Sequence, residues 1–195
     1  VLASGGRVAW HFAALRPHLV RHSLLVNSPH PGALLRELRD NPDQRTASAY
    51  MNALCRPDAE AVLSRNNSAA LLAMFGREGD VAWLTPTMRQ RYRKLWSCGL
   101  DGALNYYRAS PLKPVPEGDD SLHRIELPPS VVNVSVSTTV VWGLQDHALL
   151  PGLLDGLDHW IAPLRIVRVD RASHWIVHEQ PSLVIDAIRQ AFSAA

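Results

Sequence analysis

The chain has 195 residues, 47% of them hydrophobic and 19% charged, and its 20 Lys and Arg against 18 Asp and Glu give a net charge of +2. This composition indicates an ordinary soluble globular protein, with one domain or a domain plus an insertion. A chain of this length buries a sizeable core without a metal or a disulfide. The nearly balanced charge disfavours a nucleic-acid partner, and no apolar run reaches the roughly 18 residues of a membrane span.

The two cysteines, Cys55 and Cys98, lie far apart in unrelated contexts. Their separation matches neither a disulfide framework nor the ligand spacing of a zinc site. The first residues of the chain lack the basic, apolar and small-residue order of a signal peptide. Cysteine usage of this kind fits a reducing compartment, so we expect a cytoplasmic protein.

The first part of the chain predicts a helix, a strand and a helical insertion. Apolar residues recur at helical spacing over 6–16, and Pro17 closes the pattern. The apolar run at 23–27 precedes Ser-Pro-His-Pro, which favours a buried parallel strand followed by a loop. Residues 33–110 lack strand-like runs, and their helical patterns are broken by Pro and Gly, so we expect four or five short helices. The Pro-rich stretch 111–129 has the composition of a linker.

After this linker, strands and helices alternate. The β-branched run at 138–143 ends in Gly and predicts a strand, and 164–169 predicts another. The leucine spacing over 148–160, and a Pro in the first turn of 181–192, predict two helices. Alternation of this kind predicts the α/β fold class, with a parallel sheet covered by helices.

These elements divide the chain into a core and an insertion. The core comprises residues 1–32 and 129–195, which hold the three predicted strands. The helical insertion and its Pro-rich linker occupy 33–128. We expect this insertion to form an all-helical cap between two strands of the sheet.

Two ionisable side chains directly follow predicted strands: Asp146 follows 138–143, and His174 follows 164–169. Functional groups of open parallel sheets gather at the carboxyl ends of strands, and strands adjacent in sequence are usually neighbours in space. A carboxylate that accepts a hydrogen bond from His fixes the ring tautomer and stabilises the protonated ring. The two residues therefore predict the acid and base of a catalytic triad. The alternative is that Asp146 caps the helix beginning at Ala148 and His174 packs in a loop.

Gly5 and Gly6 open the first helix, where a strand-to-helix turn that carries a nucleophile needs small residues. With this turn, the sequence resembles the epoxide hydrolase branch of the α/β-hydrolase superfamily along nearly its whole length. The order and spacing of five segments carry the resemblance. These are Gly-Gly-Arg-Val-Ala-Trp-His-Phe-Ala-Ala (5–14), Leu-Val-Asn-Ser-Pro-His-Pro (25–31), Asn-Tyr-Tyr-Arg (105–108), Val-Trp-Gly-Leu-Gln-Asp (141–146) and Ser-His-Trp-Ile-Val-His-Glu-Gln-Pro (173–181).

The resemblance implies a partial α/β-hydrolase fold and epoxide hydrolysis without a cofactor. Members of the family attack an epoxide carbon with an Asp in a turn that typically reads His-Asp-Trp-Gly-Gly, and water activated by His hydrolyses the resulting ester. The two glycines place Ala3 at the nucleophile position, where it cannot act as a nucleophile. Ser4 falls on the next position, whose backbone N–H serves the oxyanion hole. A serine esterase that uses the Ser4 hydroxyl is an alternative.

The resemblance also implies two cap tyrosines that donate hydrogen bonds to the epoxide oxygen and protonate the leaving alkoxide. Tyr107 matches the more specific of these positions, and Tyr50 matches the other. The alternative for each is an amphipathic tyrosine of the core. Haloalkane-type relatives hold halide with Trp or Asn donors, so the two tyrosines favour an epoxide over a halogenated substrate.

Two further residues are candidates for the substrate pocket. His30 lies between two prolines just after the first predicted strand, and Trp175 follows His174 directly. We place both in the substrate pocket. The remaining histidines lack the spacing of metal ligands, so we expect neither a metal nor another cofactor.

In this superfamily about half of the sheet precedes the nucleophile turn. We therefore expect the chain to be a C-terminal portion of an epoxide hydrolase-like enzyme, inactive because of Ala3, with an unpaired edge on the strand at 23–27. A dehalogenase of the same superfamily, and a non-catalytic remnant that binds an apolar ligand, are alternatives. We expect a small apolar epoxide as substrate, a monomer or homodimer, and neither a nucleic-acid nor a membrane partner.

Overall fold

The structure, a computed structural model, describes residues 3–76 and 81–193, with the backbone alone at residues 3 and 4. It divides into two compact units. The first comprises Val1–Ser48 and Pro114–Ala195, and the second comprises Ala49–Lys113. The two units are described in turn.

The first unit is built on a parallel sheet of three strands, β1 (Ser23–Val26), β2 (Thr138–Gly143) and β3 (Leu164–Val169). Their order in the sheet is β1-β2-β3, and all three run parallel. Every residue of the central strand β2 is buried, as its continuous apolar and β-branched run predicts. The three predicted strands and the α/β fold class are therefore confirmed.

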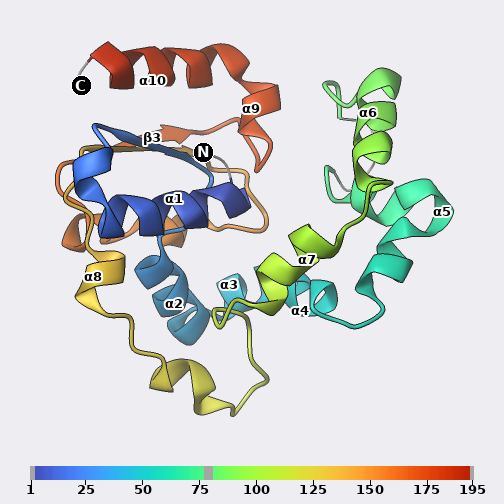
Figure 1. Ribbon diagram of the computed structural model, residues 1–195, viewed down its shortest axis with the longest axis horizontal. Coiled ribbons are helices and arrows are strands. Elements are labelled where there is room, and N and C mark those ends of the chain that lie inside the picture. Colours follow the sequence, from blue (N-terminus) through green and yellow to red (C-terminus); the bar gives the residue numbers. More distant parts are fainter. Residues whose placement is uncertain (1–2, 77–80, 194–195) are drawn as a thin grey trace. The chain divides into compact units, whose positions relative to one another are not determined.

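Helices cover both faces of this sheet (Figure 1). Val26, Val141 and Val169 point to one face, where they pack against Val184 and Ala187 of α10. The opposite face lies against α1. The α-helices of the first unit are α1 (Ala3–Leu15), α2 (Pro31–Asp40), α3 (Pro42–Ala47), α8 (Pro129–Val132), α9 (Ile176–Glu179) and α10 (Pro181–Ser193). Short 3-10 turns are η1 (Pro17–Leu19), η2 (Asp120–Arg124), η3 (Pro151–Leu154) and η4 (Leu157–His159).

The close packing of α1 on β1 depends on Gly6. A methyl group in place of its hydrogen would lie 1.9 Å from Ser28 Oγ and 2.3 Å from Ser28 Cβ. One turn further on, the buried Trp10 donates its indole N–H to the backbone oxygen of Ser28. The first helix is thus fixed against the carboxyl end of β1. A small residue is needed at Gly6 because the helix and the strand lie too close together for a larger side chain.

The predicted helix over 148–160 is wrong. The structure has the two 3-10 turns η3 and η4 there, because Pro151 and Gly152 interrupt the pattern and Gly156 adopts a left-handed φ of 63°. The apolar spacing still marked the buried side of the segment, since Leu153 and Leu157 are almost fully buried. The apolar spacing indicated which side chains are buried, but it did not indicate the conformation of the backbone.

The second unit is helical and consists of α4 (Tyr50–Leu54), α5 (Ala59–Ala73), α6 (Pro86–Trp96) and α7 (Asp101–Arg108). Its core joins Leu54, Ala59, Leu100 and Leu104. With α2 and α3, the described residues between 31 and 110 form six helical segments, instead of the four or five helices expected, and non-helical backbone at 65–68 interrupts α5. Asn41 explains why α2 and α3 are two separate helices. It ends α2, and its side chain accepts two backbone N–H groups at the start of α3.

The predicted boundaries of the insertion, 33 and 128, are wider than the second unit. Residues 33–48 and 114–128 belong to the unit that contains the sheet. The Arg39 side chain shows why, since it leaves α2 and donates to the backbone oxygens of Leu122 and Ile125 in the Pro-rich stretch. Leu122 itself is buried. The predicted role of residues 33–128, as a helical cap with its linker, stays a prediction.

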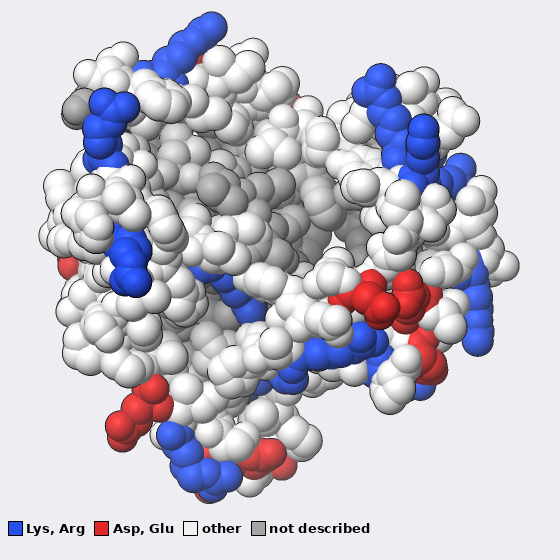
Figure 2. Space-filling view, in the orientation of Figure 1, with Lys and Arg blue, Asp and Glu red and all other residues white. Residues whose placement is uncertain are grey.

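The surface carries charges of both signs. On the face shown in Figure 2, Lys and Arg side chains stand in separate groups between uncharged residues, and Asp and Glu gather at other places. Within the described residues, no helix has the length and apolar character that crossing a bilayer requires.

Candidate active site

The sheet brings Asp146 and His174 together at the carboxyl ends of two paired strands. Asp146 lies in the turn after β2 and His174 in the loop after β3, and β2 pairs with β3 along its whole length. His174 Nδ1 lies 2.7 Å from Asp146 Oδ2. The carboxylate is fully buried, whereas the imidazole is 21% exposed. The predicted contact is confirmed, and the catalytic roles of the two residues stay predictions.

The Asp146 carboxylate is held on both of its oxygens. Oδ1 accepts the backbone N–H groups of Ala148 and Leu149, at 2.8 and 2.9 Å. Oδ2 accepts from His174 and also from the side-chain amide of Asn27, at 3.1 Å. Asp146 therefore caps the following turn and also contacts His174. The capping role and the contact with the histidine, which the sequence offered as alternatives, are compatible.

The hydrogen bond to Asp146 selects one tautomer of His174. Because the carboxylate accepts, Nδ1 carries the proton and Nε2 of the neutral ring keeps a lone pair. Trp175 packs its ring edge-on against the imidazole, with centroids 5.0 Å apart. A partly exposed imidazole whose Nε2 carries a lone pair is suited to take a proton from water.

The loop that carries His174 is fixed at the preceding residue, Ser173. Glu179 of α9 accepts the Ser173 N–H at 2.7 Å and the Ser173 hydroxyl at 2.5 Å. Asn27 donates to the Ser173 carbonyl at 2.8 Å. Both sides of this residue are thus bound by side chains from outside the loop.

Asn27 and Glu179 were not predicted from the sequence as site residues. Asn27 directly follows β1, so the position rule that selected Asp146 and His174 would have found it. It was missed because only ionisable side chains were considered. Glu179 carried no comparable signal, because its role depends on the turn of α9 that brings it back to Ser173.

His30 is almost fully buried and both of its ring nitrogens are bonded. Nδ1 accepts the N–H of Gly32 at the start of α2, and Nε2 donates to the Val132 oxygen at 2.8 Å. Its ring stacks on Trp160. Burial lowers the pKa of His30 to about 4. These contacts make His30 part of the structural frame, and its predicted place in a substrate pocket is untested.

Ala3 and Ser4 form the first turn of α1, and their side chains lie outside the described residues. The predicted nucleophile position and the predicted oxyanion N–H therefore stay predictions. Of the features expected there, the described residues show the close packing of helix on strand, since Gly6 lies directly against Ser28 at the end of β1.

Tyr50 and Tyr107 lie side by side within the second unit. Tyr50 begins α4 and Tyr107 lies near the end of α7. Their rings meet edge to face, with centroids 6.1 Å apart. The structure thus brings the two predicted tyrosines together, although they are far apart in the sequence. Their role as proton donors stays a prediction.

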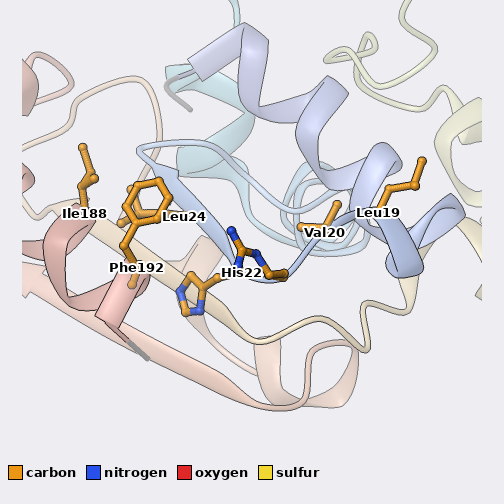
Figure 3. Close-up of a pocket in the computed structure, with 8 residues that line it drawn as sticks. Leu19, Val20, His22, Leu24, Ile188 and Phe192 are labelled. Carbon is orange, nitrogen blue, oxygen red and sulfur yellow. The ribbon is translucent and has the colours of Figure 1, made fainter. Parts of the chain in front are cut away.

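A cavity of about 370 Å³ lies beside the amino end of β1 (Figure 3). It is lined by residues that precede or begin β1, including His22 and Leu24, and by Ile188 and Phe192 of α10. His22 and Leu24 lie at the amino end of β1, whereas Asp146 follows the carboxyl end of β2. Within the described residues, no three His, Cys, Asp or Glu side chains are grouped so that they could hold a metal ion.

Comparison with known proteins identifies the family. The family model for the alpha/beta hydrolase fold matches residues 4–181. The AB hydrolase superfamily protein YfhM of Bacillus subtilis is 30% identical over 183 residues, which is 92% of this chain and 60% of that protein. Human epoxide hydrolase 4 is 26% identical over 195 residues, covering 92% of this chain and 49% of the relative.

Solved structures agree with these relatives. The crystal structure of Bacillus megaterium epoxide hydrolase in complex with an inhibitor matches with a TM-score of 0.86 and 28% identity, covering 99% of this chain and 68% of that one. An epoxide hydrolase from metagenomes of hot environments matches with a TM-score of 0.79 and 32% identity. The chain spans about half to three fifths of the length of the curated relatives quoted above. The chain belongs to the α/β-hydrolase superfamily, and within it the chain is similar to epoxide hydrolases.

Proposed function

We propose that the enzyme represented by this chain opens epoxides to vicinal diols through an alkyl-enzyme ester. The observation that carries the proposal is the 2.7 Å hydrogen bond between His174 and the buried Asp146. It occurs in a chain whose relatives are named epoxide hydrolases. A small apolar epoxide is the proposed substrate, and no cofactor takes part.

In the proposed reaction, a carboxylate at the position of residue 3 attacks an epoxide carbon, and the carbon–oxygen bond of the ring breaks. The alkoxide takes its proton from a tyrosine hydroxyl. Water then gives a proton to Nε2 of His174 and attacks the ester carbonyl, which releases the diol and restores the carboxylate. Asp146 stabilises the imidazolium that forms, and the proton finally returns from His174 to the tyrosinate.

The pairing of Tyr50 with Tyr107 supports the epoxide over a halogenated substrate. An epoxide oxygen leaves as an alkoxide, which needs a proton donor, whereas a halide leaves without one. The two ring centroids are 6.1 Å apart, so both side chains belong to one local group. We propose Tyr107 as the principal donor and Tyr50 as its neighbour on the epoxide oxygen.

Ala3 sets the expected behaviour of the chain itself. A methyl side chain cannot form the ester, so we expect the 195-residue chain to produce no diol. The test measures diol formation from styrene oxide by two purified forms. One is this chain, and the other carries Ala3→Asp and is extended upstream by the corresponding segment of the Bacillus megaterium relative.

We expect only the extended form to produce diol, and His174→Ala or Tyr107→Phe to lower its turnover by about 100-fold or more, the usual contribution of a positioned acid or base. His147→Gln, in the exposed part of the Asp146 turn, and Tyr106→Phe serve as matched controls that keep the activity. A folded extended form that yields no diol contradicts the proposal. Halide release from haloalkanes by that form would assign a dehalogenase instead.

A further inference from the structure

We infer that Asn27 is a positioning residue that holds His174 and Asp146 in their hydrogen-bonded arrangement. Its side-chain amide binds the Asp146 carboxylate, the peptide before His174 and the end of strand β2 at the same time. The inference rests on the proposed function only in that this function uses the His174–Asp146 pair. The hydrogen bonds themselves are independent of the substrate.

The Asn27 amide uses both of its N–H donors and its carbonyl oxygen at one level of the sheet. One N–H of Nδ2 donates to Asp146 Oδ2 at 3.1 Å, and the other donates to the Ser173 oxygen at 2.8 Å. Oδ1 accepts the backbone N–H of Gly143 at 2.8 Å. Asn27 has no exposed surface, so no water competes for these groups. Buried bonds of this kind are costly to break, because each partner is left unsatisfied.

These partners come from all three strand ends. Asn27 follows β1, Gly143 ends β2, and Ser173 lies in the loop after β3. The loop lies so close to β2 that a methyl group on Gly143 would be 2.4 Å from the Ala172 oxygen and 2.5 Å from the Ser173 oxygen. The Asn27 amide therefore joins the end of the outer strand β1 to the turn after β2, which carries Asp146, and to the loop after β3, which carries His174.

The shared oxygen Oδ2 explains how Asn27 acts on the histidine. Asp146 Oδ2 accepts from both Asn27 Nδ2 and His174 Nδ1, so the Asn27 donor fixes the direction of the carboxylate. The second Asn27 donor fixes the peptide next to His174. One amide thus positions both partners of the 2.7 Å hydrogen bond.

Both the backbone and the side chain at this position favour asparagine. Asn27 has a φ of 40°, in the left-handed region that Asn adopts more readily than most residues. An aspartate of the same size would still accept from Gly143, but it would place an oxygen against the Asp146 carboxylate and the Ser173 carbonyl. Asn27→Asp therefore removes the two donors while keeping the shape and the acceptor.

The test follows the His174 ring by nitrogen-15 NMR in the 195-residue chain, near neutral pH. In the unaltered chain we expect the Nδ1 proton, which lies in the hydrogen bond to Asp146, to give a single downfield signal and to exchange slowly with water. In Asn27→Asp and Asn27→Ala, we expect that proton to exchange at least about tenfold faster, with the ring divided between two tautomers. Thr138→Val is the control, because Thr138 is a buried donor at the opposite end of β2. It should lower stability without altering the ring signals.

The inference is overturned if either Asn27 variant folds and leaves the tautomer and the exchange of the Nδ1 proton unchanged. If both variants fail to fold, the inference is tested by amide exchange in the unaltered chain. Its two Asn27 side-chain amide protons must be protected from exchange, and free exchange overturns the inference. None of these measurements requires turnover, so a failed diol assay with intact ring signals removes the proposed function and leaves the role of Asn27 standing.

Discussion

His174 and His30 differ in the contacts that their ring nitrogens make. His174 has a partly exposed side chain and binds a carboxylate with Nδ1. His30 uses both nitrogens within the core, and burial lowers its pKa to about 4. Its Nδ1 accepts from Gly32, so protonating that nitrogen breaks the bond and places a charge in the core. His174 is thus placed for proton transfer, whereas His30 holds parts of the core together.

The lowered pKa of His30 predicts that acid destabilises the first unit. The unfolded ring, with a pKa near 6.5, binds more protons than the folded ring between pH 6.5 and 4. Stability is therefore complete above pH 6.5 and falls as the pH drops toward 4. Linkage gives a loss of about 2 kcal/mol between pH 7 and pH 5, measurable by urea unfolding. Burial lowers the pKa of His22 and of His178 in the same direction.

A variant separates His30 from the other titrating groups. His30→Asn is unable to take a proton, and its short polar side chain can still accept from the start of α2. We expect this variant to be less stable at pH 7 and to lose most of the difference between pH 7 and pH 5. An unchanged pH dependence in His30→Asn would refute the assignment to His30.

Among the helices and strands, those with continuous or strictly periodic patterns were predicted correctly. The strands at 138–143 and 164–169 have the predicted bounds, and the first and last helices begin and end close to the predicted positions. The prediction of a helix over 148–160 was wrong because Pro151 and Gly156 impose turns, which the leucine spacing does not indicate. Proline and glycine outweigh periodicity when they fall inside a pattern, since they act on the backbone directly.

The packing of α1 on β1 yields a prediction about Gly6. Gly6→Ala would place a methyl group 2.3 Å from Ser28 Cβ, which forces the helix away from the strand. We expect a loss of about 1–3 kcal/mol of unfolding free energy, typical of overpacking. The control is Gly102→Ala in α7, where no atom lies within 4 Å of the added methyl group. That change should raise stability by about 0.5–1 kcal/mol. Equal effects of the two substitutions in thermal or urea unfolding would contradict this account.

Taken as a unit, the sheet and its helices leave apolar side chains exposed around the amino end of β1. Leu19 is 63% exposed and Phe192 is 75% exposed, and both line the cavity of about 370 Å³ (Figure 3). Val8 and Ile185 are further exposed apolar residues on the helices α1 and α10. Exposed apolar surface next to an edge strand is prone to association.

This surface predicts that the 195-residue chain binds an apolar fluorescent dye in its folded state. Leu19→Gln combined with Phe192→Gln should lower dye fluorescence markedly at unchanged stability, because neither side chain is buried. Leu95→Gln in α6 is the control, since Leu95 is 64% exposed but does not line the cavity. Equal loss of fluorescence in the control would mean that the dye does not bind at the cavity.

The sequence by itself determined the family, the three strands and the meeting of Asp146 with His174. These depend on local patterns and on the rule that parallel strands bring their carboxyl ends to one edge. Only the tertiary structure decided how that pair is held. Asn27 follows a strand, as Asp146 does, but its partner Ser173 lies 146 residues away and no local pattern identifies it. The bonds of Glu179 to Ser173 depend on the turn of α9. The tertiary structure also decided that His30 is a core residue, because burial depends on what packs around a side chain.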